Sequence, residues 1–114
     1  MKRDTGIGTF AAILLAAGVA IASAADTGPA KIDIYGGSLG NVPFPHSQHQ
    51  ERIDDCQVCH SAFPQKKDAI KKMIDDGAMK AKKVMNTQCI KCHKQEKRAG
   101  KPHGPLTCKT CHVK

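Results

Sequence analysis

Hydrophobic residues are distributed very unevenly along this chain of 114 residues. Residues 10–22 form one apolar run that only Gly18 interrupts. After this run apolar side chains become sparse, and residues 31–35 alternate between polar and apolar as a half-buried strand does. A turn-rich segment at 36–41 leads to a possible returning strand at 42–44, which Pro43 confines to a sheet edge. The pattern therefore predicts a small β-hairpin.

Helical spacing follows in the middle of the chain. Ile70, Met73 and Ile74 fall on one face of a helix predicted over residues 65–76. A second helical stretch is predicted over residues 78–85, and Asn86-Thr87 should then cap a separate short helix through residues 89–93. Glycines at 100 and 104 mark loops near the end of the chain.

The apolar run has the features of an export signal. Lys2 and Arg3 precede it, and the small residues Ser23-Ala24-Ala25 follow it. The uncharged stretch 5–25 is 21 residues long, which is enough for an uncleaved membrane anchor. Its Ala- and Gly-rich composition and the processing site favour a cleaved signal peptide over residues 1–25. We expect residues 26–114 to form one mature domain in the periplasm, with no stable membrane insertion after cleavage.

The remaining chain has little to bury. Aromatic residues make up 4% of the sequence, with no Trp, one Tyr and three Phe. A domain this small and this poor in large apolar side chains does not readily fold unaided. This composition excludes an ordinary enzyme with its own large core, and it directs attention to the six cysteines and six histidines.

The cysteines form three pairs of identical spacing, and a histidine follows each pair. The three motifs are Cys56-x-x-Cys59-His60, Cys89-x-x-Cys92-His93 and Cys108-x-x-Cys111-His112. C-x-x-C-H is the attachment motif of c-type haem. The two thiols add across the two vinyl groups of one haem, and the adjacent His supplies the proximal ligand of its iron. The sequence thus predicts three covalent haem c groups.

Other uses of paired cysteines explain the pattern less well. A four-Cys zinc site from the second and third motifs fits the 15-residue gap between Cys92 and Cys108. It leaves Cys56 and Cys59 unused and gives no reason for the three histidines. Disulfides are common in exported chains, but they also give no reason for a histidine after every cysteine pair. A redox-active C-x-x-C site would require a βαβ pattern, which is absent around the motifs.

Three histidines outside the motifs match the three distal ligands that the haems require: His46, His49 and His103. His46 and His49 are three residues apart, so both rings point to one side of a helical turn and bring two haems close together. Histidine on both faces of every iron gives low potentials and leaves no open position for a substrate. We therefore expect an electron carrier rather than an enzyme.

The charge of the chain is strongly basic. The formal net charge is +8, and lysines are spread from Lys66 to Lys114. Nucleic-acid binding is a poor explanation, because the chain is exported and has few aromatics to stack on bases. We expect the basic surface to attract acidic docking surfaces of redox partners.

On these residues the chain resembles the class III cytochromes c, and specifically the small triheme periplasmic cytochromes of the c7 type. The resemblance covers residues 31–114 and rests on the hairpin, the segment 44–49 and the three motifs. It implies a small, mostly α-helical or irregular multihaem fold, with a short N-terminal β-hairpin and few helices wrapped around three haems. It also implies that His46 and His49 are the distal ligands of the first and second haems.

The resemblance further implies a low-potential carrier in anaerobic respiration. Such carriers move electrons between inner-membrane donors and periplasmic or outer-membrane cytochromes or reductases. The third haem departs from the family pattern. The relatives place its distal His shortly before the second motif, where this chain has Met85, four residues before Cys89. His103 is the predicted substitute, while Met85 and an open site remain alternatives. An open third haem would suit the haem subunit of a reductase or a direct metal-ion reductase.

Overall fold

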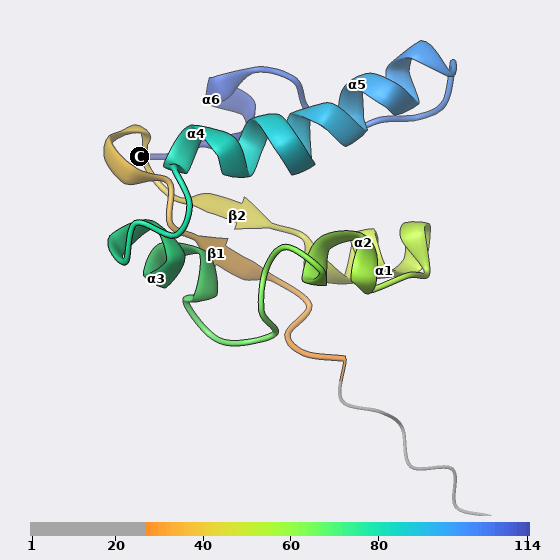
Figure 1. Cartoon of the computed structure of the whole chain (residues 1–114). Helices are drawn as coiled ribbons and strands as arrows, with labels where there is room; N and C mark the ends of the chain where they lie inside the picture. The colour runs from red at the N-terminus through yellow and green to blue at the C-terminus, as the bar shows by residue number, and fades with distance from the viewer. Residues whose placement is uncertain (1–26) are drawn as a thin grey trace, which may run out of the picture.

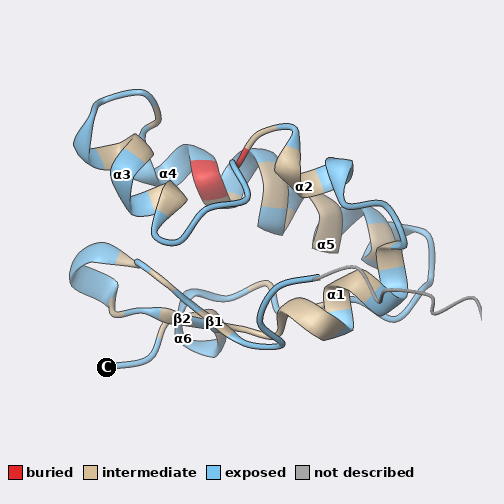
Figure 2. Ribbon diagram, turned by 90° about the horizontal axis from the view of Figure 1, so that it is seen from below, coloured by how far each residue is buried: buried red, intermediate tan, exposed pale blue. Residues whose placement is uncertain are grey.

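The structure is a computed structural model that describes residues 27–114. The predicted signal peptide, residues 1–25, lies outside the described residues. Figure 2 shows two groups of elements, with the hairpin, α1 and α6 on one side and α3, α4 and α5 on the other. This arrangement agrees with the predicted fold of one hairpin and few short helices.

The predicted hairpin is confirmed. Strands β1 (Ile32–Ile34) and β2 (Val42–Phe44) pair antiparallel, with Ile32 opposite Phe44 and Ile34 opposite Val42. These four side chains are half-buried, whereas Asp33 and Pro43 are exposed, so one face of the ribbon points inward. Pro43 is tolerated because both strands of a two-stranded sheet are edges. The 3₁₀ turn η1 (Gly37–Leu39) joins the strands.

Three short helices follow the hairpin: α1 (His46–Ile53), α2 (Gln57–His60) and α3 (Ala69–Asp75) (Figure 1). Asp54 ends α1 in a left-handed conformation, with φ of 55°. Asp68 has the same φ, and α3 starts only after it, four residues later than the predicted start at 65. A left-handed residue cannot continue a right-handed helix, so the prediction was too long at its N-terminal end.

The next helical stretch is continuous where the sequence predicted two separate helices. Helix α4 (Ala81–Val84), the π-helical turn η2 (Met85–Cys89) and α5 (Ile90–Arg98) follow one another directly. The prediction of a cap at Asn86-Thr87 was therefore wrong. The Thr87 hydroxyl donates instead to the Lys83 carbonyl at 2.6 Å, which is how Thr is accommodated inside a helix.

The C-terminus returns to the hairpin. Helix α6 (Cys108–Cys111) is one turn long. After it, the Val113 amide donates to the Asn41 carbonyl at 2.9 Å, so the end of the chain is tied to the turn between the strands. This tie fixes the third motif beside the hairpin.

The polypeptide has almost no core of its own. Among residues 27–114 the buried hydrophobic residues are Phe63 and Val84, at 8% and 7% exposure. Within the same range, no helix is both long and apolar enough to cross a membrane. Two buried side chains cannot offset the entropy of ordering about 90 residues, so the fold requires another source of stability.

Candidate functional site

Each C-x-x-C-H motif lies on a helical turn. The first is on α2, the second spans the junction of η2 and α5, and the third is on α6. In the first and third motifs the His amide donates to the carbonyl of the first Cys, from His60 to Cys56 at 2.9 Å and from His112 to Cys108 at 2.8 Å. The helical turn therefore places both thiols on one side, with the imidazole directly after them.

Burial raises the pKa of three of the six cysteine thiols, those of Cys59, Cys89 and Cys111. Desolvation raises the pKa of Cys59, and the neighbouring Cys92 raises it further. Desolvation also raises the pKa of Cys89, with added contributions from Cys59 and Cys111. Redox-active C-x-x-C motifs require a lowered thiol pKa, so this alternative is not supported. The same interactions show that the second motif lies close to both the first and the third.

The zinc and disulfide alternatives also lack support. Within residues 27–114 no group of three or more His, Cys, Asp or Glu is arranged to hold a metal ion. None of the six cysteines forms a disulfide with another. The cysteines of the second and third motifs therefore do not form the four-Cys cluster that a zinc ribbon requires.

All six histidines are oriented in the same way. In every ring Nδ1 lies 2.7–2.9 Å from a main-chain carbonyl oxygen. A carbonyl only accepts, so Nδ1 carries the proton and Nε2 keeps a free lone pair. Metal-ligating histidines are typically oriented by this second bond. The six carbonyls, for His46, His49, His60, His93, His103 and His112 in turn, belong to Pro29, Pro45, Phe63, Pro105, Gly104 and Gly40.

Two glycines allow the main chain to pack against these rings. A Cβ on Gly104 would lie 2.4 Å from Cε1 and Nε2 of His93. A Cβ on Gly36 would lie 2.5 Å from Nδ1 of His112, and nearer still to the Gly40 carbonyl. Larger residues at either position would displace the imidazole.

Four histidines form two ring pairs. The ring centres of His46 and His60 are 6.2 Å apart, with planes at 87°. Those of His49 and His93 are 6.3 Å apart, with planes at 34°. Two imidazoles that hold one metal ion through Nε2 at about 2 Å from opposite sides have ring centres about 6 Å apart. Both pairs thus have the separation that a bis-histidine haem requires.

The third site is different. Nε2 of His112 is buried and has no hydrogen-bond partner. A buried polar atom without a partner is costly unless something else binds it. His103 does not lie against it. His103 is exposed, its Nδ1 donates to the carbonyl of the next residue, and no ring contact joins it to His112 in the described part of the chain.

The carbonyls that orient the rings were missed at the sequence level. A signal was nevertheless present, because five of the six belong to Pro or Gly and the sixth, Phe63, precedes Pro64. These residues direct the main chain sharply past each histidine. The ring of Phe44 also packs on His49, with ring centres 4.3 Å apart.

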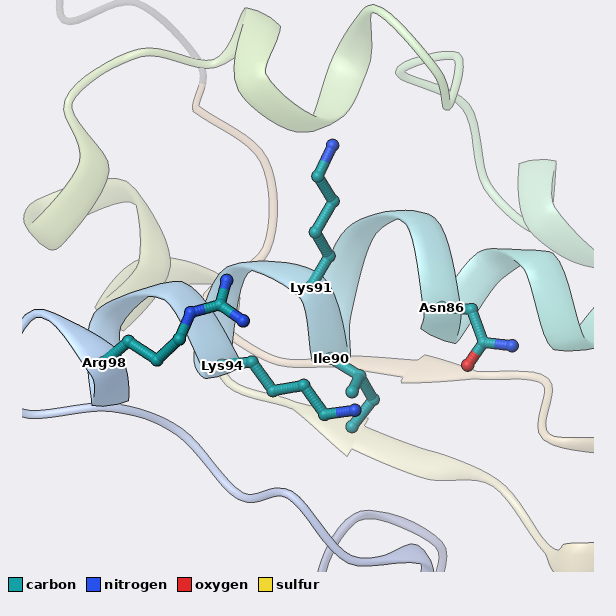
Figure 3. A pocket seen from close by; sticks show the side chains of 5 residues that line it. All are labelled: Asn86, Ile90, Lys91, Lys94 and Arg98. Atoms are coloured by element: carbon teal, nitrogen blue, oxygen red, sulfur yellow. The ribbon is translucent and has the colours of Figure 1, made fainter.

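A basic hollow lies on the helix that carries the second motif. It has a volume of about 280 Å³ and is lined by Asn86, Ile90, Lys91, Lys94 and Arg98. Figure 3 shows Lys94 extending along the helix beside Ile90, while Lys91 points away from the helix axis. Three cations and no carboxylate line the hollow, so it attracts anionic groups.

Comparison with known proteins gives a consistent assignment. Residues 42–113 match the family described as cytochrome c7 and related cytochrome c. The chain is 33% identical to a cytochrome c7 of Geobacter metallireducens over the full length of both. It is 32% identical over 81 residues to a high-molecular-weight cytochrome c of Nitratidesulfovibrio vulgaris, of which it spans 15%.

A solved structure shows the same similarity. The fold resembles that of PpcC, a cytochrome c7 from Geobacter sulfurreducens, with a TM-score of 0.52 and 28% identity. The match covers 75% of this chain and 99% of PpcC. With three complete attachment motifs in place, the chain belongs to the cytochrome c7 family, electron-transfer cytochromes with three covalently attached haem c groups.

Proposed function

We propose that this protein is a low-potential periplasmic carrier that moves electrons between redox partners in anaerobic respiration. The main support is the common orientation of the six histidines, each with Nδ1 bonded to a carbonyl and Nε2 free. Nothing in this arrangement acts as a general acid, a general base or a substrate pocket. At the first two sites it would hold iron on both faces of a haem.

The ring pairs suggest the ligands of the first two haems. The first haem would be attached to Cys56 and Cys59, with His60 and His46 as axial ligands. The second would be attached to Cys89 and Cys92, with His93 and His49 as axial ligands. The third would be attached to Cys108 and Cys111, with His112 as its proximal ligand. Haem iron supplies a one-electron couple, and imidazole on both faces lowers its potential relative to a thioether ligand.

The chain itself holds the first two sites close together. His46 and His49 lie on the same helix, α1, three residues apart. Their partners His60 and His93 come from two different helices, α2 and α5. One helical turn therefore links both sites, and the separation between them is fixed by the geometry of α1. Short, rigid separations favour rapid electron exchange within the molecule.

The charge of the chain suggests the nature of its partners. Residues 26–114 carry a formal net charge of +7 before haem is added. The basic hollow on α5 lies on the helix of the second motif, so an acidic partner bound there would be close to that site. We infer that acidic surfaces of donor and acceptor proteins dock on this face.

A spectroscopic redox titration of the purified holo-protein tests this proposal. We expect reduced and oxidised spectra of low-spin haem and negative midpoint potentials for the first two sites. Mass spectrometry should show an added mass of about 1850 Da for three haems. Positive potentials at all three sites, or turnover of a small substrate without a protein partner, would contradict a low-potential carrier.

Export is tested by deleting residues 1–25. Haem c attachment takes place outside the cytoplasm, so we expect the deletion variant to accumulate inside the cell without haem. The full-length protein should appear in the periplasmic fraction, shortened at residue 24 or 25. A red deletion variant in the cytoplasm would contradict the predicted signal peptide.

No second imidazole lies against His112 among the described residues, and this favours a second candidate function. If the third iron has no distal ligand, that site is open to a small molecule, as in a haem subunit of a reductase or a direct metal-ion reductase. Carbon monoxide binding to one of the three reduced haems would support this candidate. Its absence would support the electron carrier.

A further inference from the structure

We propose that Arg52 is a positioning residue of the second haem site, where it holds together the two segments that carry the axial histidines. It acts through the loop of residues 99–107, which connects α5 to α6. This inference rests on the proposed function in taking His49 and His93 as the axial ligands of the second haem.

Arg52 lies on the helix that carries the distal ligand. His49 and Arg52 are three residues apart on α1 and therefore on the same side of that helix. An arginine in the last turn of a helix ordinarily interacts with the last carbonyls of the same helix or with solvent. Nη2 of Arg52 donates instead to the Pro102 carbonyl at 2.7 Å, 50 residues away in the sequence. This charged donor ties α1 to loop 99–107.

Loop 99–107 leaves α5 in a fixed direction. Gly100 adopts the left-handed conformation, with φ of +68°. The Lys101 amide donates to the Glu96 carbonyl at 3.0 Å, which is the bond of a Schellman motif. The chain consequently turns back along α5 on its way to α6 (Figure 1). Pro102 follows this turn directly, so the acceptor of the Arg52 bond lies on an ordered part of the loop.

The same loop orients the proximal ring. The Pro105 carbonyl accepts from Nδ1 of His93 at 2.7 Å. Gly104 lies so close to the His93 ring that a Cβ at this position would overlap it. Two and three residues separate Gly104 and Pro105 from Pro102. A displacement of Pro102 is therefore transmitted to the ring of His93 over a very short length of chain.

These contacts form a closed circuit around the second site. It runs from His49 along α1 to Arg52, across to Pro102, and through Pro105 to His93. The two rings complete it, with centres 6.3 Å apart and planes at 34°. Each ring is oriented by a carbonyl on its own side, so the angle between the planes depends on how α1 sits against the loop. The Arg52 bond fixes this relative position.

The bond also opposes opening of the site. His49 leaves the iron only if α1 moves away from the α5 side, and this movement separates Arg52 from Pro102. Removing the bond should therefore make the second iron more accessible to an external ligand. The first site is less exposed to this change, since His46 lies at the other end of α1 and bonds the Pro29 carbonyl.

The test compares holo-protein of wild type, Arg52→Ala and Arg52→Lys. Alanine is a strong helix former, so α1 should persist in the first variant. Its second haem should show a shifted and broadened rhombic electron paramagnetic resonance signal. When reduced, that haem should bind carbon monoxide about fivefold more tightly, which is the effect of losing one net hydrogen bond. Arg52→Lys keeps a charged donor and should largely restore both properties. The signal of the first haem should not change in either variant.

Lys101→Ala is the matched control for the loss of charge. Lys101 precedes Pro102, is exposed, and takes part in neither ion pair of residues 27–114. This variant removes one positive charge from the same loop and leaves the Arg52 bond in place. Its resonance signal and carbon monoxide affinity should match those of wild type.

Two results would overturn the proposal. One is an unchanged second-haem signal in Arg52→Ala, and the other is an equal shift in Lys101→Ala, which would show an effect of charge alone. Both would leave the triheme electron carrier intact. A high-spin second haem in wild type would instead contradict the ligand pair, and with it the proposed function.

Discussion

The first two sites and the third site are built by different means. At the first two, a single helix supplies both distal imidazoles, and each ring already faces its proximal partner at 6.2 or 6.3 Å. At the third, the proximal ring is held by the hairpin turn, and no second imidazole faces it among the described residues. Local helical spacing therefore determines two sites, while tertiary packing determines the third.

The largest expected effect comes from removing the haem groups, on which all three sites depend. With only Phe63 and Val84 buried among residues 27–114, the polypeptide without haem should be unfolded. Expression without the haem-attachment machinery should give a colourless chain with the circular dichroism of a random coil. A haem-free chain with native helical content and dispersed NMR signals would show that the polypeptide folds alone.

Single distal substitutions should separate the first two sites from each other. His46→Ala removes the ring opposite His60 and should convert only the first haem to a high-spin form. His49→Ala should do the same only for the second, whose proximal ring is His93. Absorption and paramagnetic NMR spectra distinguish the haems. If both variants alter the same haem, or neither alters any, the ring pairs are not ligand pairs.

A glycine substitution should affect the second site through its support rather than its ligands. In Gly104→Ala the new Cβ would lie 2.4 Å from the His93 ring, so the ring or the loop must shift. We expect a stability loss of about 1–3 kcal/mol and a change in the potential of the second haem alone.

Gly77→Ala is the matched control for this substitution. Gly77 has φ of +74° with no atom within 4 Å of a new Cβ, so the substitution strains the backbone without contacting any ring. It should lower stability and leave all three potentials unchanged. Equal changes of potential in the two variants would contradict the role of Gly104.

The smallest expected effect concerns docking near the second site. Lys94→Glu reverses one charge of the basic hollow on α5 and should slow electron transfer to an acidic partner several-fold at low salt. The difference should vanish at high salt, since screening removes steering between exposed charges. Lys66→Glu, in an exposed loop outside the hollow, should have less effect. Stopped-flow kinetics over a salt series measures both, and equal slowing would show that only net charge matters.

Most of the fold was predictable where the signal is local. The alternation at 31–35 gave the hairpin, and the three motifs gave the haem number, because both depend on short spacings. The boundaries of the helices were less predictable. The left-handed Asp68 delays α3, and the Thr87 hydroxyl bond within the helix replaces the expected cap. Neither conformation is favoured strongly enough by its residue type to be read from the sequence.

The ligands of the first two haems could be predicted from the sequence, but the surroundings of His103 could not. The pairing of His46 and His49 with the first and second motifs came from the family resemblance, and in the structure the ring centres of the corresponding histidines lie 6.2 and 6.3 Å apart. The surroundings of His103 could not be foreseen. Its loop is positioned by the contact of Gly104 with His93, which depends on segments 11 residues apart in the chain folding against each other.

The most direct test is the electron paramagnetic resonance spectrum of the fully oxidised holo-protein. Imidazole planes at 87° leave two iron d orbitals nearly equal in energy, so the first haem should give a highly anisotropic low-spin signal. Planes at 34° separate these orbitals, so the second haem should give an ordinary rhombic low-spin signal. We predict both signals, each integrating to one spin per molecule, and no high-spin signal from the first or second haem. High-spin signals from the first or second haem would contradict the account.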